Sequence, residues 1–128
     1  KSNNKLVNIL ASIYAQDHHC DDCILINQDT NIAESISGNI FILLNNIIKT
    51  PPLDDGCIDG VMRRVILKEK SFNIQEDSIS ILDIFNAKEV FVTNVISGVK
   101  WVSQIRNHKY THQKSTEMVK LLNNKYLV

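Results

Sequence analysis

The first part of the chain places its apolar residues at helical spacing. Within residues 2–16 the apolar positions recur every three or four residues and form one stripe, which consists of Leu6, Ile9, Leu10, Ile13 and Tyr14. Ser2 precedes this stripe, and serine is a favoured N-cap because its hydroxyl accepts a hydrogen bond from a free backbone N–H. The pattern predicts a helix over residues 2–16.

The middle of the chain consists of short apolar runs separated by polar turn residues, which is typical of strands. Asn45-Asn46 predicts a tight turn between two of these runs, because asparagine tolerates a positive φ. Trp101 lies in the last run, and we expect it in the core. The expected strands are residues 23–26, 32–35, 39–44, 47–49, 73–76, 89–93 and 99–105.

Three further helices complete the prediction. Asp59 is the expected N-cap of a helix over residues 60–70, and a short helix follows at residues 80–87. The amphipathic tail, residues 114–127, predicts a helix whose inner side carries Met118, Leu121 and Leu122. This mixture of strands and helices predicts an α+β domain with hairpins in its first half.

The composition fits one globular domain. The chain has 128 residues, of which 44% are apolar and 22% charged. Its 14 basic and 14 acidic side chains cancel, whereas a nucleic-acid-binding protein normally carries a basic excess. No apolar run approaches the roughly 18–20 residues that cross a bilayer. We therefore expect neither nucleic acid nor a membrane as a partner.

The first residue is Lys1 rather than methionine, and no signal-peptide pattern follows it, so we expect an internal start. Three cysteines at uneven spacing do not form a disulfide framework and favour a reducing cytoplasm. His18-His19-Cys20 with Cys23 could suggest zinc. A second ligand pair at suitable spacing is missing, so we predict no metal site.

Five short strings carry more information together than any of them does alone. In their order and spacing they resemble the class IV aminotransferase family, whose cofactor is pyridoxal 5'-phosphate (PLP). The separation of Lys1 and Glu34, 34 − 1 = 33 residues, matches the lyase-like and D-amino-acid branches of that family. The strings are Lys1-Ser2-Asn3-Asn4-Lys5-Leu6, Ile32-Ala33-Glu34-Ser35 with Gly38-Asn39-Ile40-Phe41, Thr50-Pro51-Pro52-Leu53, Gly60-Val61-Met62-Arg63, and Ala87-Lys88-Glu89-Val90-Phe91-Val92-Thr93-Asn94.

The resemblance implies the cofactor-binding large domain of the fold-type-IV PLP enzymes, similar to D-amino-acid aminotransferase. Residues 1–128 are then the C-terminal domain, and the small N-terminal domain is absent from the chain. Lys1 is implied to be the Schiff-base lysine, which acts as nucleophile and later as acid or base. Glu34 is implied to hold the proton on the pyridine nitrogen. The phosphate is implied to bind at Gly60, Val61, Met62, Val95 and Ile96.

Two places in the chain separate the reactions of this family. Its aminotransferases usually carry threonine where this chain has Met62, and a Gly-Thr or Ser-Thr pair where it has Asn94-Val95. Both departures resemble the 4-amino-4-deoxychorismate lyase branch, which releases pyruvate and forms 4-aminobenzoate for folate synthesis. Lys5 also replaces a tyrosine that is common in the aminotransferases.

The resemblance therefore implies a PLP-dependent lyase that acts on a small amino substrate and forms a homodimer. A branched-chain or D-amino-acid aminotransferase is the alternative within the family, because only these few positions discriminate. An alternative of another class is a degenerate, non-catalytic domain. If the small domain is required, the 128-residue piece is expected to be inactive by itself.

Overall fold

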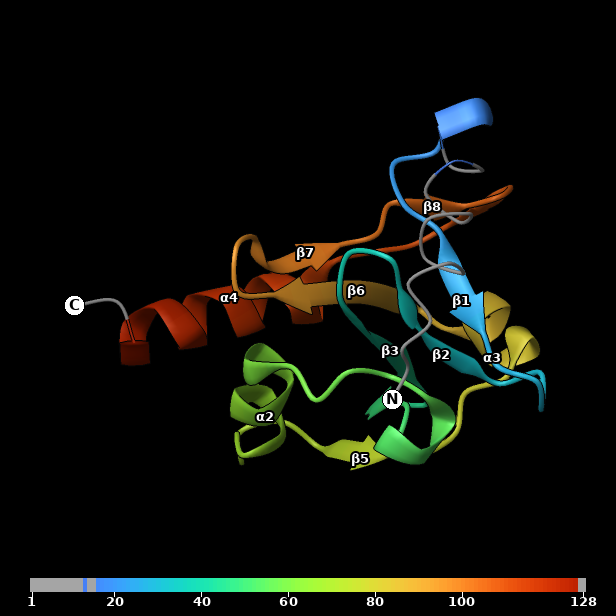
Figure 1. The fold of residues 1–128 in the computed structure, drawn as a ribbon. Helices are drawn as coiled ribbons and strands as arrows, with labels where there is room; N and C mark the ends of the chain where they lie inside the picture. Colours follow the sequence, from blue (N-terminus) through green and yellow to red (C-terminus); the bar gives the residue numbers. More distant parts are fainter. Residues whose placement is uncertain (1–12, 14–15, 127–128) are drawn as a thin grey trace.

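A computed structural model of the chain describes residue 13 and residues 16–126 (Figure 1). The predicted α+β fold is confirmed, because the centre is a five-stranded sheet with helices packed on it. The strands of the described part are β1 (Ile24–Ile26), β2 (Ile32–Ser35), β3 (Asn39–Leu44), β4 (Ile47–Thr50), β5 (Ile74–Glu76), β6 (Glu89–Asn94), β7 (Gly98–Trp101), β8 (Gln104–Ile105) and β9 (His108–Lys109).

The large sheet has the strand order β5-β4-β3-β6-β7. β4 and β5 are parallel, whereas the other neighbours are antiparallel. β1 pairs with β2, and β8 pairs with β9, as separate two-stranded ladders. The β3–β4 hairpin turns at Asn45 and Asn46, whose φ angles of 54° and 64° confirm the predicted tight turn.

The helices pack around this sheet. They are the 3-10 helix η1 (Leu53–Asp55) and the α-helices α2 (Val61–Leu67), α3 (Ile81–Asn86) and α4 (Gln113–Tyr126). The helix predicted at residues 2–16 falls almost entirely outside the described residues and stays a prediction. Among the described helices, none combines the length and the apolar character that crossing a membrane requires.

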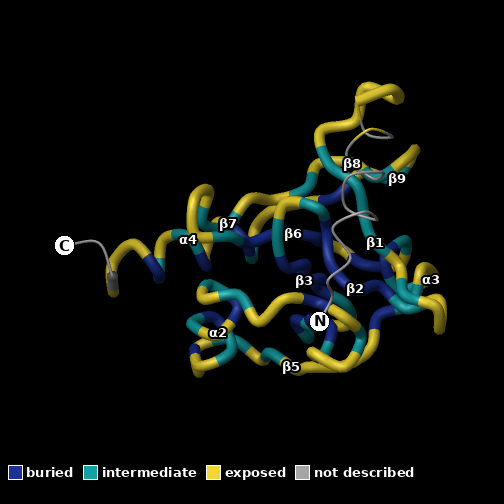
Figure 2. The backbone as a smooth tube through the Cα atoms, viewed as in Figure 1, coloured by how far each residue is buried: buried dark blue, intermediate teal, exposed yellow. Residues whose placement is uncertain are grey.

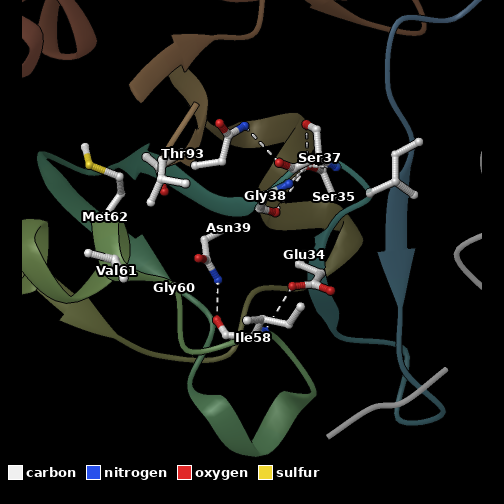
Figure 3. A pocket seen from close by; sticks show the side chains of 13 residues that line it. Glu34, Ser35, Ser37, Gly38, Asn39, Ile58, Gly60, Val61, Met62 and Thr93 are labelled. Carbon is white, nitrogen blue, oxygen red and sulfur yellow. Dashed lines mark hydrogen bonds between the residues drawn. The ribbon is translucent and has the colours of Figure 1, made fainter. Parts of the chain in front are cut away.

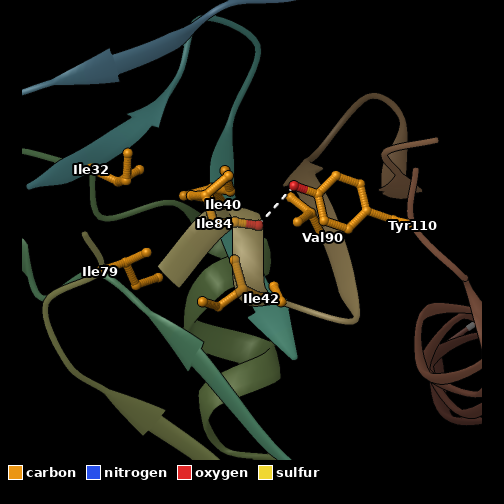
Figure 4. Packing of buried hydrophobic residues seen from close by; sticks show 8 residues of the cluster. Ile32, Ile40, Ile42, Ile79, Ile84, Val90 and Tyr110 are labelled. Carbon is orange, nitrogen blue, oxygen red and sulfur yellow. Dashed lines mark hydrogen bonds between the residues drawn. The ribbon is translucent and has the colours of Figure 1, made fainter. Parts of the chain in front are cut away.

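β3 separates two hydrophobic cores, because successive side chains of a strand point to opposite faces. Ile40 and Ile42 face the α3 side, where they pack with Ile84 and Val90 (Figure 4). The opposite face of the sheet carries Phe41, Leu43, Ile48 and Phe91, together with Ile66 of α2 and Met118 and Leu122 of α4. Figure 2 shows β3 and β6 as buried strands at the centre of the molecule.

The second of these faces becomes polar at one end of the sheet. Phe41 lies opposite Phe91 in the β3–β6 register, with the rings stacked 5.1 Å apart between centroids. Two residues earlier on β3, the same face carries Asn39, which lies opposite Thr93. The apolar core of this face therefore ends at the Asn39–Thr93 pair.

The prediction that Asp59 caps the second helix is wrong. Gly60 is the N-cap, and no side chain caps the first turn. The Asp59 carboxylate is instead directed to two arginines, 3.9 Å from Nη1 of Arg63 and 3.6 Å from Nε of Arg64. The helix also ends at Leu67 rather than near residue 70.

The prediction of one strand at residues 99–105 is also wrong. The segment divides into β7, which joins the edge of the large sheet, and β8, which pairs with β9. Trp101 was expected in the core, but it is 41% exposed because β7 is an edge strand. Its indole instead lies against the ring of His112, with 4.1 Å between centroids and a tilt of 30° between the ring planes.

Candidate active site

A cavity of about 250 Å³ opens at the polar end of the sheet, beyond the Asn39–Thr93 pair (Figure 3). The turn between β2 and β3, the segment that leads into α2, and the end of β6 meet there. The described residues form the wall of this cavity, whose volume lies somewhat below the about 300–1,000 Å³ of typical ligand sites. The lining residues are Glu34, Ser35, Ile36, Ser37, Gly38, Asn39, Ile58, Gly60, Val61, Met62, Thr93, Asn94 and Val95.

Glu34 supplies a buried carboxylate to this wall. The residue is 8% exposed on β2, and its Oε1 accepts a hydrogen bond of 3.0 Å from the backbone N–H of Ile58. A buried carboxylate requires such partners, because removing it from water is costly. The bond also fixes the direction of the carboxylate, which Figure 3 shows at the edge of the cavity beside Ile58.

A residue of a second strand, β3, also binds the segment before α2. Asn39 donates from Nδ2 to the carbonyl of Ile58 at 2.7 Å. A Cβ atom on Gly60 would lie 2.3 Å from Oδ1 of Asn39, so only glycine allows this approach without displacing the amide. Asn39 and Glu34 thus position the backbone from which Val61 and Met62 start α2.

Asn94 shapes the loop on the opposite side of the cavity. Its Nδ2 donates to the carbonyl of Ser37 at 2.9 Å, and its Oδ1 accepts from the N–H groups of Ile96 and Ser97 at 2.9 and 2.7 Å. One asparagine side chain therefore folds the loop and ties it to the β2–β3 turn. Val95 lines the cavity, whereas Ile96 does not, and the Ile96 side chain is 93% exposed.

Thr93 was not singled out from the sequence. The residue is 1% exposed and lines the cavity, yet its Oγ1 has no hydrogen-bond partner among the described residues. Its backbone is approached closely by the β2–β3 turn, since a Cβ on Gly38 would lie 2.1 Å from the Thr93 carbonyl oxygen. Strand alternation after Phe91 predicts the face on which Thr93 lies, but it does not predict the unpaired hydroxyl.

The structure brings most of the sequence-predicted site residues together. Glu34, Gly60, Val61, Met62 and Val95 line one cavity, although they come from three separate parts of the chain. Lys1 lies outside the described residues, so its role stays a prediction.

A zinc site was not predicted, and His18, His19, Cys20 and Cys23 were the residues considered for it. The described part of the chain holds no group of three or more histidine, cysteine or acidic side chains that could bind a metal ion.

Comparison with known proteins identifies the family. The model of the family described as "Amino-transferase class IV" matches residues 1–105. The chain belongs to the class IV aminotransferase family. The predicted family resemblance is thereby confirmed over most of the chain.

Two curated relatives differ in the reaction that their names state. The D-alanine aminotransferase of Bacillus licheniformis is 31% identical over 108 residues, which are 82% of this chain and 38% of that protein. The aminodeoxychorismate lyase of Vibrio harveyi is 28% identical over 108 residues, which are 82% of this chain and 40% of that protein. The chain thus spans less than half the length of these relatives.

Solved structures of the family have the same fold. The branched-chain amino acid aminotransferase of Escherichia coli matches 98% of this chain and 43% of its own, at a TM-score of 0.88 and 20% identity. An aminotransferase of Brucella abortus, solved with its cofactor PLP, matches 93% of this chain and 44% of its own, at a TM-score of 0.84 and 20% identity. PLP is the cofactor of this family.

The cavity wall offers partners for both polar ends of PLP. A protonated pyridine nitrogen requires an acceptor, and Glu34 is a buried carboxylate that the Ile58 N–H already orients. A phosphate requires hydrogen-bond donors, and the backbone of Val61 and Met62, which begins α2 without a side-chain cap, lies in the same wall. The residues present therefore fit the cofactor of the family.

Proposed function

We propose that the chain is the PLP-binding domain of an aminodeoxychorismate lyase-type enzyme, which releases pyruvate and leaves 4-aminobenzoate. Asn94 is the observation that carries this choice. Its side chain occupies the loop where the family's aminotransferases place a Gly-Thr or Ser-Thr pair, and it makes the three hydrogen bonds that fold the loop. Met62, in place of the usual threonine, supports the same choice at the start of α2.

PLP supplies an electron sink when it is bound, because its protonated ring accepts the electrons of a neighbouring carbanion. Glu34 would keep the proton on the ring nitrogen through a charge-assisted hydrogen bond. Lys1 would hold the cofactor covalently and then take the proton from the substrate carbon that bears the amino nitrogen.

The phosphate is assigned, in the same proposal, to the backbone at Gly60, Val61 and Met62 and to the loop at Val95 and Ile96. The first three residues begin α2, whose first turn has no side-chain cap. In the loop, the Ile96 N–H donates to Asn94. Val95, which lines the cavity, is therefore the better placed of the two loop donors.

We propose further that residues 1–128 form a C-terminal cofactor-binding domain that a smaller domain completes, and that the whole enzyme is a homodimer. Apolar side chains around the cavity support this arrangement. Four large apolar residues are exposed there, by 60% for Ile58, 52% for Val61, 69% for Val95 and 93% for Ile96. A cluster of this kind is unusual on a surface that faces only water. Light scattering of the full-length protein would test the homodimer.

The reaction is tested by supplying the full-length protein and PLP with aminodeoxychorismate in the absence of a keto acid. The proposal predicts stoichiometric pyruvate and 4-aminobenzoate without an acceptor. Amino-group transfer from D-alanine or a branched-chain amino acid that depends on a keto acid would instead assign an aminotransferase. No turnover of either kind by a protein that binds PLP would favour a non-catalytic domain.

A further inference from the structure

The turn between β2 and β3 carries a serine hydroxyl at the edge of the cavity. Ser37 is exposed and lines the cavity, and in Figure 3 it lies on the side away from Ile58. Its Oγ donates to the carboxylate of Asp22, a half-buried residue in the segment before β1. The other oxygen of this carboxylate accepts from the backbone N–H of Cys23 at 2.7 Å. Asp22 is therefore fixed in place as the acceptor for Ser37.

Other contacts already hold the backbone of this turn. The carbonyl of Ser37 accepts from Nδ2 of Asn94 at 2.9 Å. The N–H of Ile36 donates to the carbonyl of Cys23 at 3.0 Å, so the turn is tied to the segment before β1 through the main chain as well. The bond from Ser37 to Asp22 is therefore more than the shape of the turn requires.

The hydrogen bonds of the turn determine what Ser37 can offer to a ligand. A serine hydroxyl has one proton and two lone pairs. Two acceptors lie within reach of the Ser37 proton, Oγ of Ser35 at 3.3 Å and the carboxylate of Asp22, and the carboxylate is the stronger because it is charged. The Ser35 hydroxyl donates to the carbonyl of Gly38 at 3.2 Å, so it has no proton for Ser37 or for a ligand. The Ser37 hydroxyl can consequently only accept a hydrogen bond from the cavity.

This restriction selects one of the polar groups of the substrate. An amino group can donate to Ser37, whereas a carboxylate can only accept, and it would also be repelled by the charge of Asp22 behind the hydroxyl. Within the described part of the wall, no lysine, arginine or histidine lines the cavity to offset that repulsion. The Ser37 side of the cavity therefore suits the amino group and disfavours a carboxylate.

We propose that Ser37 is a specificity-determining residue, which accepts a hydrogen bond from the amino group of the substrate. Asp22 is a positioning residue, which keeps the hydroxyl in this role by accepting its proton. The inference rests on the proposed function, which supplies the amino substrate, and it adds an orientation. The substrate binds with its amino group toward the β2–β3 turn and with its carboxylates away from it.

The test measures binding to the full-length protein after PLP has been fixed to its lysine with borohydride, so that an amine binds without reacting. The probes are 4-aminobenzoate, benzoate and terephthalate, which carry an amino group, a hydrogen atom and a second carboxylate at the same ring position. Calorimetry should show that 4-aminobenzoate binds roughly threefold to tenfold more tightly than benzoate, as expected for one neutral hydrogen bond. Terephthalate should bind more weakly than benzoate.

The variant D22N should change this order. Asparagine has one acceptor oxygen, which the N–H of Cys23 requires, so its amide nitrogen faces Ser37 and donates to it. The Ser37 proton is then free to turn toward the cavity. The preference for 4-aminobenzoate should fall below about twofold, and terephthalate should bind at least as tightly as benzoate. S37A should lose the preference for 4-aminobenzoate but still disfavour terephthalate, because Asp22 keeps its charge.

D21N is the matched control, because it removes the same charge from the exposed neighbour of Asp22, a residue that does not line the cavity. It should rank the three probes as wild type does. A gain in terephthalate binding in D21N as large as that in D22N would show an effect of overall charge and overturn the inference.

The outcomes also separate this inference from the proposed function. If the wild-type protein binds none of the three probes, the lyase function and the inference fail together. If it binds 4-aminobenzoate and benzoate equally, or if its preference survives in S37A, the Ser37 contact is refuted and the lyase function stands. A preference that is unchanged in D22N would refute the role of Asp22.

Discussion

Single polar side chains determine the geometry of the cavity. Glu34 and Asn39 hold the N–H and the carbonyl of Ile58 from two different strands, and Asn94 organises the loop opposite. Each of these contacts joins a side chain to backbone, so each fixes a segment rather than one atom. The cavity is consequently preorganised by a few residues that the core itself does not require.

Glu34→Gln tests the proposed ring partner. The amide oxygen of glutamine still accepts from the Ile58 N–H, so the melting temperature should change little. The charge that retains the ring proton is lost, and we expect pyruvate release to slow at least tenfold, by about 1.5–3 kcal/mol of lost stabilisation. Melting and steady-state kinetics of the full-length variant measure the two effects.

Full activity of this variant at an unchanged melting temperature would show that Glu34 is not the partner of the ring nitrogen. A large loss of stability would instead show that the carboxylate has mainly a structural role.

We predict that ionisation of the Tyr110 phenol lowers the stability of the fold at high pH. Burial raises the pKa of its phenol to about 12, from the ordinary value of about 10, and its hydroxyl donates to the carbonyl of Ile84 at 2.7 Å (Figure 4). The unfolded chain then ionises at a lower pH than the folded one. The contribution of this phenol to the free energy of unfolding is fully present below about pH 10, and it is lost as the pH rises to about 12.

Urea unfolding of wild type and Tyr110→Phe measures this effect, because other titrating groups are common to both proteins. At pH 8 the variant should be less stable by about 1 kcal/mol, through the lost hydrogen bond. The difference should shrink or change sign near pH 11.5. A constant difference would contradict the assigned pKa.

The family strings singled out Glu34 and the residues that begin α2, which line one cavity in the structure, but they did not single out Thr93. A string records which residue types occur at fixed spacing, whereas an unpaired hydroxyl depends on what surrounds it in space. The error at Trp101 has the same origin. An apolar strand pattern does not reveal whether the strand lies at the centre or at the edge of a sheet.

Strands and helices were predicted well where the pattern is local. Short apolar runs between polar turn residues gave β3 with both ends correct and β6 one residue short, and Asn45-Asn46 gave the hairpin turn. The parallel pairing of β4 with β5 was not predicted, because it joins segments on either side of α2. The local pattern also could not predict the cap of α4, because the capping residue is distant in sequence. The carboxylate of Glu89 on β6 accepts from the N–H groups of Lys114 and Ser115.

The spacing of β6 from the β2–β3 turn depends on one glycine. A Cβ on Gly38 would lie 2.1 Å from the Thr93 carbonyl oxygen, and this backbone atom can move only with the strand. We expect Gly38→Ala to lower the free energy of unfolding by about 3 kcal/mol. It should also weaken PLP binding, because Thr93 and Asn94 would shift.

Gly98→Ala is the control for this change. Gly98 has a φ of 70° and nothing within 4 Å of a new Cβ, so only backbone strain of about 1 kcal/mol is expected. Denaturant unfolding of both variants measures the difference. Equal losses would show that close packing at Gly38 does not limit stability.

At the scale of the whole molecule, the fold brings segments from three parts of the chain to one end of a sheet. Family membership is shown over residues 1–105, whereas the named relatives catalyse different reactions and extend well beyond the matched part. The reaction must therefore be decided by the residues at the cavity and by the rest of the full-length protein. Both readings within the family require the same covalent attachment of PLP.

That attachment is tested most directly by reducing the full-length protein with borohydride in the presence of PLP and locating the label by mass spectrometry. The proposed site predicts one label per chain, on the peptide that carries Lys1, and much less label when PLP is first removed. A label on any other lysine, or a protein that remains unlabelled at saturating PLP, would contradict the account.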